Sequence, residues 1–111
     1  MLDTSPLTAA VERFADRLRA APQSRLQQGA AAAALELARE LSARAQTLEG
    51  VPVRQMPDAG MFVVGDQVAV AGLDLAEALR AVREGDGTTA PSGMLDEAVG
   101  LVEQAEVRAM R

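Results

Sequence analysis

The chain has 111 residues, 49% of them hydrophobic, and a formal net charge of −5 at pH 7. Because it contains no His, Cys, Tyr, Trp or Lys, the sequence excludes imidazole and thiolate catalysis, a lysine Schiff base, disulfides and nitrogen- or sulfur-ligated metal sites. The acidic balance and the scarcity of aromatic residues argue against direct nucleic-acid binding, and the Lys-free, Arg-rich composition is typical of a high-GC bacterium.

The first predicted element is a helix over residues 6–20. Ser5 followed by Pro6 is a helix-start signal, because the serine hydroxyl can accept a hydrogen bond from an exposed amide and the missing proline N–H costs nothing there. Apolar residues then recur at the spacing of one helix face. Pro22 disfavours helical backbone at the residue before it and therefore ends the helix.

A second helix is predicted from Ser24 to about residue 48. Ser24 and Gln27 have the spacing of a capping box, and Gly50 stands where a left-handed residue commonly closes a helix. Because so few residues separate the two helices, we expect them to form an antiparallel helical hairpin.

The valine-rich middle of the chain predicts β-structure. Residues 51–56 form a weak candidate strand that a proline interrupts. Residues 61–64 and 67–71 flank Gly65 and Asp66, a pair that suits a type II′ turn. The sequence therefore predicts a small antiparallel β-hairpin or a three-strand meander.

Both faces of the predicted hairpin are apolar, which a hairpin with one face in water would not show. In this register one face carries Met61, Val63, Val68 and Val70. One face must pack on the helices, and we expect the other face or the open strand edge to pair with another chain. The candidate interface residues are Met61, Phe62, Val63, Val64, Val68 and Val70. An alanine-rich core with few large side chains also favours self-association, which predicts a homodimer.

Two further helices are predicted in the last third of the chain. Asp74 and Glu77 form another capping box and open a short helix that stops at Gly85. The polar loop of residues 85–91 is expected to be the most mobile internal segment. The last helix begins after Ser92.

Carboxylates offer the alternative that would make the chain chemically active. Glu36 and Glu40 share one predicted helix, and Glu103 and Glu106 share another, so the two pairs could face each other across a divalent cation such as Mg²⁺. The chain would then be a small carboxylate-dependent enzyme or a small-molecule-binding protein. The competing interpretation places these glutamates on solvated helix faces, where glutamate is expected.

The sequence thus predicts a single α+β domain over residues 1–111, mostly helical, with a helical hairpin, a β-hairpin or meander, and two further helices. The favoured function is a non-enzymatic protein-interaction module, an adaptor or regulator, that forms a homodimer and uses no cofactor. Because no leader pattern and no apolar stretch of about 20 residues is found, we expect no membrane insertion and a cytoplasmic location.

Overall fold

The computed structural model describes residues 2–82 and 90–111, and the regular structure of this part is entirely helical. The long helices are α1 (Ser5–Ala20), α3 (Ala31–Glu49), α4 (Val64–Ala81) and α5 (Pro91–Ala109). A short helical turn, α2 (Gln23–Arg25), and a π-helical turn, η1 (Leu26–Ala30), connect α1 to α3. The predicted α+β fold class is therefore wrong, because the described residues contain helices and no strand.

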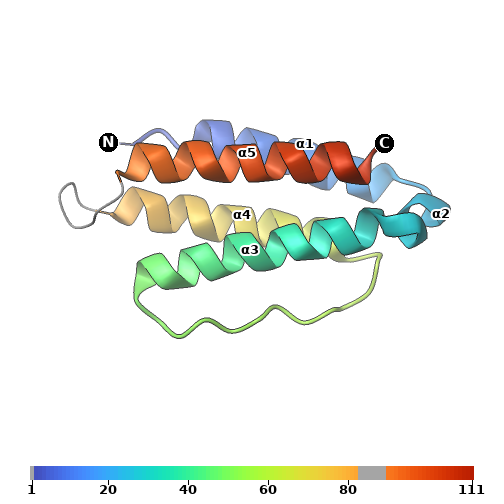
Figure 1. The fold of residues 1–111 in the computed structure, drawn as a ribbon, viewed down its shortest axis with the longest axis horizontal. Coiled ribbons are helices and arrows are strands. Elements are labelled where there is room, and N and C mark those ends of the chain that lie inside the picture. The colour runs from blue at the N-terminus through green and yellow to red at the C-terminus, as the bar shows by residue number, and fades with distance from the viewer. Residues whose placement is uncertain (1, 83–89) are drawn as a thin grey trace.

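The four long helices form an elongated bundle (Figure 1). Helices α1 and α5 run in one direction along it, and α3 and α4 run in the other. Helix α4 packs against both α1 and α3, and α5 packs against the same two helices, so α1 and α3 lie diagonally across the bundle. The first two long helices are antiparallel, as predicted, but they do not pack on each other as a hairpin.

Because α3 and α4 are parallel, the chain must return along the length of the bundle between them. Residues 50–63, called the crossover segment from here on, make this return along the side of α3 and α4 that faces away from α1 and α5 (Figure 1). Gly50 closes α3 with a left-handed φ of 74°, as the sequence predicts.

The predicted β-hairpin and meander do not form. Residues 61–63 belong to the crossover segment, and residues 64–71 form the first two turns of α4. The short helix predicted to open at Asp74 is the second half of the same helix. Valine content favours a strand, but burial along α4 follows the period of a helix. The buried residues are Val64, Gly65, Val68, Ala71, Gly72, Leu75, Ala76, Ala78 and Leu79.

Two glycines on α4 allow this helix to approach α1 closely. A Cβ added at Gly65 would lie 3.1 Å from the carbonyl oxygen of Ala15. A Cβ added at Gly72 would lie 2.6 Å from both Cγ atoms of Val11. The glycine that suggested a hairpin turn in the sequence therefore serves helix packing instead.

The path from α1 to α3 bends at Gly29. This residue has a φ of 133°, a backbone conformation that favours glycine, and it interrupts the helical path within η1. The predicted capping box of Ser24 and Gln27 is not formed, because α2 starts one residue earlier, after Pro22, and has no side-chain cap.

The last helix begins at Pro91, close to the predicted start after Ser92. The loop predicted to be mobile, residues 85–91, falls largely on residues 83–89, which lie outside the described residues. Large side chains from every long helix meet in the core. The most deeply buried are Leu7, Val11, Phe14, Leu41, Val64, Val68, Leu75, Leu79 and Val102.

Candidate functional site

The crossover segment is held against the bundle by side chains that bind its backbone. The Gln46 amide of α3 pairs with both backbone groups of Arg54: the Arg54 N–H donates to Gln46 Oε1 at 2.8 Å, and Gln46 Nε2 donates to the Arg54 carbonyl at 3.2 Å. Two turns closer to the start of α3, Arg39 Nε donates to the carbonyl of Met56 at 2.8 Å. In this way α3 supplies the hydrogen bonds that a neighbouring strand would otherwise provide.

The far end of the crossover segment is fixed to α4. Gln67 Nε2 donates to the carbonyl of Pro57 at 2.9 Å. A tight turn follows, in which Asp58 Oδ1 accepts the N–H of Gly60 at 2.9 Å and Gly60 has a φ of 100°. This turn directs the chain into α4.

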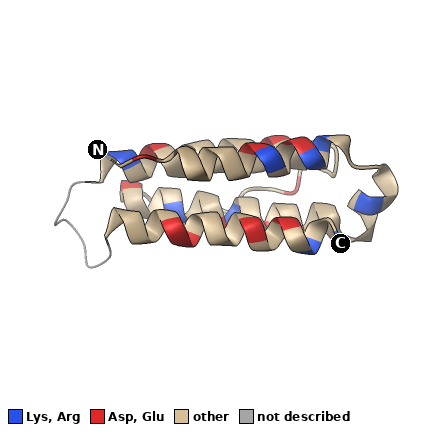
Figure 2. Ribbon diagram, turned by 90° about the horizontal axis from the view of Figure 1, so that it is seen from above, with Lys and Arg blue, Asp and Glu red and all other residues tan. Residues whose placement is uncertain are grey.

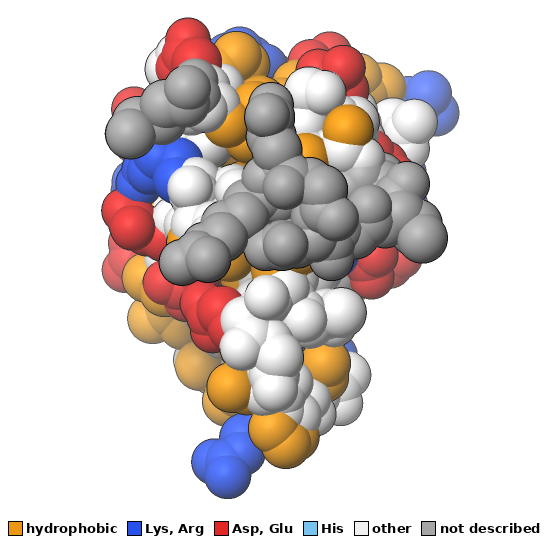
Figure 3. Space-filling model, turned by 90° about the vertical axis from the view of Figure 1, so that its left-hand side faces the viewer, with side chains coloured by type: hydrophobic (Ala, Val, Ile, Leu, Met, Phe, Trp, Pro, Cys, Tyr) orange, Lys and Arg blue, Asp and Glu red, His pale blue; other side chains and the backbone are white. Residues whose placement is uncertain are grey.

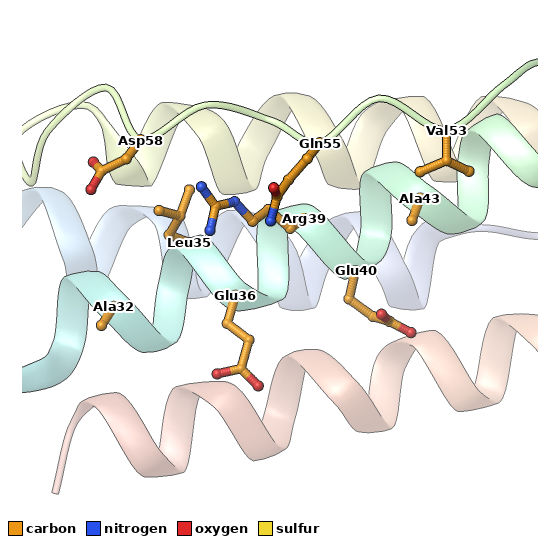
Figure 4. Close-up of a pocket in the computed structure, with 9 residues that line it drawn as sticks. All are labelled: Ala32, Leu35, Glu36, Arg39, Glu40, Ala43, Val53, Gln55 and Asp58. Carbon is orange, nitrogen blue, oxygen red and sulfur yellow. The ribbon is translucent and has the colours of Figure 1, made fainter.

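A groove of about 680 Å³ lies between α3 and the crossover segment (Figure 4). Its lining residues are Ala32, Leu35, Glu36, Arg39, Glu40, Ala43, Val53, Gln55 and Asp58. Figure 4 shows that Glu36 and Glu40 point toward α5, away from the crossover segment, whereas the Arg39 side chain lies beneath that segment. The carboxylates and the arginine of the groove therefore do not converge on one point.

Three of the four glutamates that could have held a cation are engaged by arginines, and Glu103 is exposed. Glu36 lies 3.7 Å from Arg108, and Glu40 accepts a hydrogen bond from Arg44 at 2.9 Å. In the described part of the chain, no three acidic residues gather closely enough to hold a metal ion. The two predicted carboxylate pairs do not face each other.

Glu106, the fourth of these glutamates, faces α1 instead of α3. It is 7% exposed, and its two oxygens accept hydrogen bonds from Arg13 Nε and Arg17 Nη1, each at 3.2 Å. Figure 2 shows acidic and basic residues interspersed along α1 and mainly acidic residues along α5. The two ion pairs of Glu106 join these helices. The arrangement is a structural clamp with no free carboxylate oxygen for a ligand.

A smaller pocket of about 330 Å³ opens between α3, α4 and α5. Its apolar floor contains Leu75, Leu79 and Met94. Arg44 at its rim joins Glu40 and Glu97, with 2.7 Å between Arg44 Nη2 and Glu97 Oε1. Burial alone would lower the pKa of Arg44, but the hydrogen bonds to the two carboxylates outweigh burial and raise it. The charged side chains at the rim of this pocket are therefore paired with one another.

Most of the exposed large hydrophobic side chains lie in one stretch of the chain. Among the described residues, all but one of them lie between residues 51 and 73, on the crossover segment and on the outward side of α4; the exception is Val107 on α5. We call this set the apolar face: Val51, Val53, Phe62, Val63, Val70 and Leu73. The end-on view in Figure 3 shows hydrophobic side chains in several places, among them its top, its lower left and its bottom.

Because a helix replaces the predicted hairpin, some of the six candidate interface residues are exposed and others are buried. Phe62, Val63 and Val70 are exposed, with Phe62 reaching 75%, and they belong to the apolar face. Val64 and Val68 are buried in the core, and Met61 packs partly buried against it. The predicted shared face is therefore wrong, because residues two apart on a helix point in nearly opposite directions.

Sequence reasoning missed Leu73, Val51 and Val53 as members of the exposed set. The signal for Leu73 was present, since it follows Val70 by three residues and both fall on the polar side of the helical period of α4. No sequence signal marks the two valines of the crossover segment as exposed.

Comparison of the chain with protein-family models, with curated proteins and with solved structures finds no match. Within residues 2–82 and 90–111, no helix has both the length and the apolar character needed to cross a bilayer.

Proposed function

We propose that this chain is a non-enzymatic protein-interaction module that associates with a second copy of itself through the apolar face. The observation that supports the proposal is the concentration of exposed large hydrophobic side chains on residues 51–73. Large hydrophobic side chains left exposed to water commonly mark a site of protein association. The adaptor or regulatory role and the cytoplasmic location stay predictions.

The surroundings of the apolar face fit an interface. On α4, Val70 and Leu73 lie one turn apart on the outward side, and exposed acidic residues flank them at Asp66, Asp74 and Glu77. An apolar centre with a charged rim is the usual anatomy of a protein interface. The charged rim would also discourage nonspecific association.

The carboxylate-dependent alternative lacks comparable support. Glu36, Glu40 and Glu106 are each positioned beside an arginine, so a cation would have to displace an existing ion pair. We therefore do not propose a metal-dependent activity for this chain.

Sedimentation equilibrium on matched variants tests the proposal. The double substitution Val70→Asp and Leu73→Asp places two charges in the apolar face and should convert the dimer to a monomer, because each carboxylate would have to be desolvated on association. Val107→Asp is the control, since Val107 and Val70 are both 54% exposed on outward helix faces.

The proposal predicts that Val107→Asp associates as the parent does and that all three proteins keep the same helical circular dichroism. Equal weakening by the two sets of substitutions, or no weakening by either, would rule out the apolar face as the interface.

A further inference from the structure

The crossover segment is anchored to the bundle by two methionines. Of residues 50–63, all of which the structure describes, only Met56 and Met61 are not exposed, and both pack partly buried against the hydrophobic core. Within the described residues, the backbone of residues 52–59 makes no hydrogen bond to another backbone group. The two thioether side chains therefore supply the apolar contact that keeps this segment in place.

Met56 lies where the segment is joined to two helices. Its own carbonyl accepts a hydrogen bond from Arg39 of α3, and the carbonyl of the next residue, Pro57, accepts one from Gln67 of α4. Met61 follows the tight turn, three residues before α4 begins. Each of these hydrogen bonds replaces a bond to water, so their net contribution is modest and the segment depends on the methionine contacts as well.

Methionine is the side chain of this protein that mild oxidants attack. The sequence has no Cys, Trp, Tyr or His, and it contains five Met. A hydroperoxide transfers one oxygen atom to the thioether sulfur: the O–O bond breaks, an S–O bond forms, and the hydroperoxide is reduced to an alcohol or to water. The product, methionine sulfoxide, is polar and disrupts apolar contacts.

We propose that Met56 and Met61 are oxidation sites at which a hydroperoxide releases the crossover segment from α3 and α4. A sulfoxide packed against the core loses its hydrogen bonds to water, so oxidation favours the detached segment. Because Val53 and Phe62 of the apolar face lie on this segment, its release also changes the proposed interface. Enzymatic reduction of the sulfoxide restores the thioether, which makes the change reversible. The inference goes beyond the proposed function and does not depend on self-association.

Trypsin cleavage after Arg54 measures the release. Arg54 is the only basic residue in the crossover segment, and Gln46 binds both of its backbone groups, so cleavage there requires the segment to detach. The protein is treated with hydrogen peroxide, the peroxide is removed, and the fragments that end at Arg54 after brief digestion are quantified by mass spectrometry. Oxidation of both methionines should raise the rate of this cleavage about tenfold.

Leucine variants identify the methionines responsible. Met56→Leu with Met61→Leu keeps the apolar contact but removes the sulfur, so peroxide should leave its cleavage rate unchanged. Met94→Leu with Met110→Leu is the matched control, since these two methionines are also partly buried against the core, and it should respond to peroxide as the parent does. Met56→Gln with Met61→Gln places polar side chains at both sites and should be cleaved faster without peroxide.

Three results would overturn the proposal: peroxide oxidises Met94 and Met110 but leaves Met56 and Met61 intact, the oxidised parent is cleaved after Arg54 no faster than before, or the double leucine variant at 56 and 61 responds as the parent does. Loss of the helical circular dichroism on oxidation would also overturn it, because the whole bundle would then have unfolded. Cleavage is measured at low concentration on the monomer, so failure of the proposed self-association would leave these results unaffected.

Discussion

Gly72 of α4 lies directly against Val11 of α1, so closely that a Cβ at position 72 would come within 2.6 Å of both Val11 Cγ atoms. Gly65, two turns earlier on α4, makes a similar approach to the Ala15 carbonyl. These two glycines set the distance between α1 and α4.

We predict that Gly72→Ala destabilises the fold by about 1–3 kcal/mol, because the added methyl group overpacks a closed interface. The gain in helix propensity of about 1 kcal/mol offsets only part of this cost. Gly100→Ala on α5 is the control: a Cβ there meets nothing within 4 Å, so the same substitution should raise stability. Urea denaturation of both variants measures the difference. Stabilisation by Gly72→Ala would show that α1 and α4 are farther apart than described.

The clamp between α1 and α5 yields a second prediction. Glu106→Ala should cost about 2–3 kcal/mol, because it removes a buried carboxylate that accepts charged hydrogen bonds from Arg13 and Arg17. Glu103→Ala, on the exposed side of the same helix, should stay within about 0.5 kcal/mol of the parent. Thermal melts of the two variants suffice. Equal effects would mean that the ion pairs contribute nothing to stability.

A third prediction tests whether residues 64–71 form a helix or the strand that the sequence suggested. Val68 is 0% exposed and Val70 is 54% exposed, although a strand would place both on one face. Val68→Asp should therefore unfold the protein, since burying an unpaired carboxylate costs several kcal/mol out of a total stability of about 5–15 kcal/mol. Val70→Asp should leave the monomer within about 0.5 kcal/mol. Similar losses in denaturant melts would favour the hairpin over α4.

The helical parts of the fold were largely predictable from local signals. Ser5 and Pro6 marked the start of α1, although the N-cap is Thr4 and the predicted serine cap does not form. Gly50 marked the end of α3, and the last helix begins next to its predicted start. These signals depend on a few neighbouring residues and on backbone conformations that only certain residues adopt.

The middle of the chain was not predictable in the same way. Valine favours strands only weakly. A glycine such as Gly65 looks the same in a sequence whether it forms a turn or allows a neighbouring helix to approach closely. The reason for this glycine is Ala15, fifty residues earlier in the chain, which a local pattern cannot reveal. The available clue was the helical spacing of apolar residues from Val64 to Leu79. The valine-rich runs and the apparent cap at Asp74 concealed this spacing.

The candidate site was predictable only in part. Phe62, Val63 and Val70 were identified as candidate interface residues for their apolar character, and they are exposed, but the reason given for placing them at an interface was a hairpin face that does not exist. The glutamate pairs followed helix spacing correctly, yet spacing within one helix cannot tell which neighbour a side chain faces. Glu106 faces arginines of α1, whereas Glu36 lies near Arg108 of α5.

The molar mass of the unmodified protein, measured by light scattering over a range of concentrations, tests the central claim most directly. The account predicts a mass that approaches twice 11.6 kDa as concentration rises. It also predicts that the mass returns to that of the monomer when Val70 and Leu73 are replaced by Asp. A mass of 11.6 kDa at every concentration would contradict the claim that the apolar face binds a second copy of the chain.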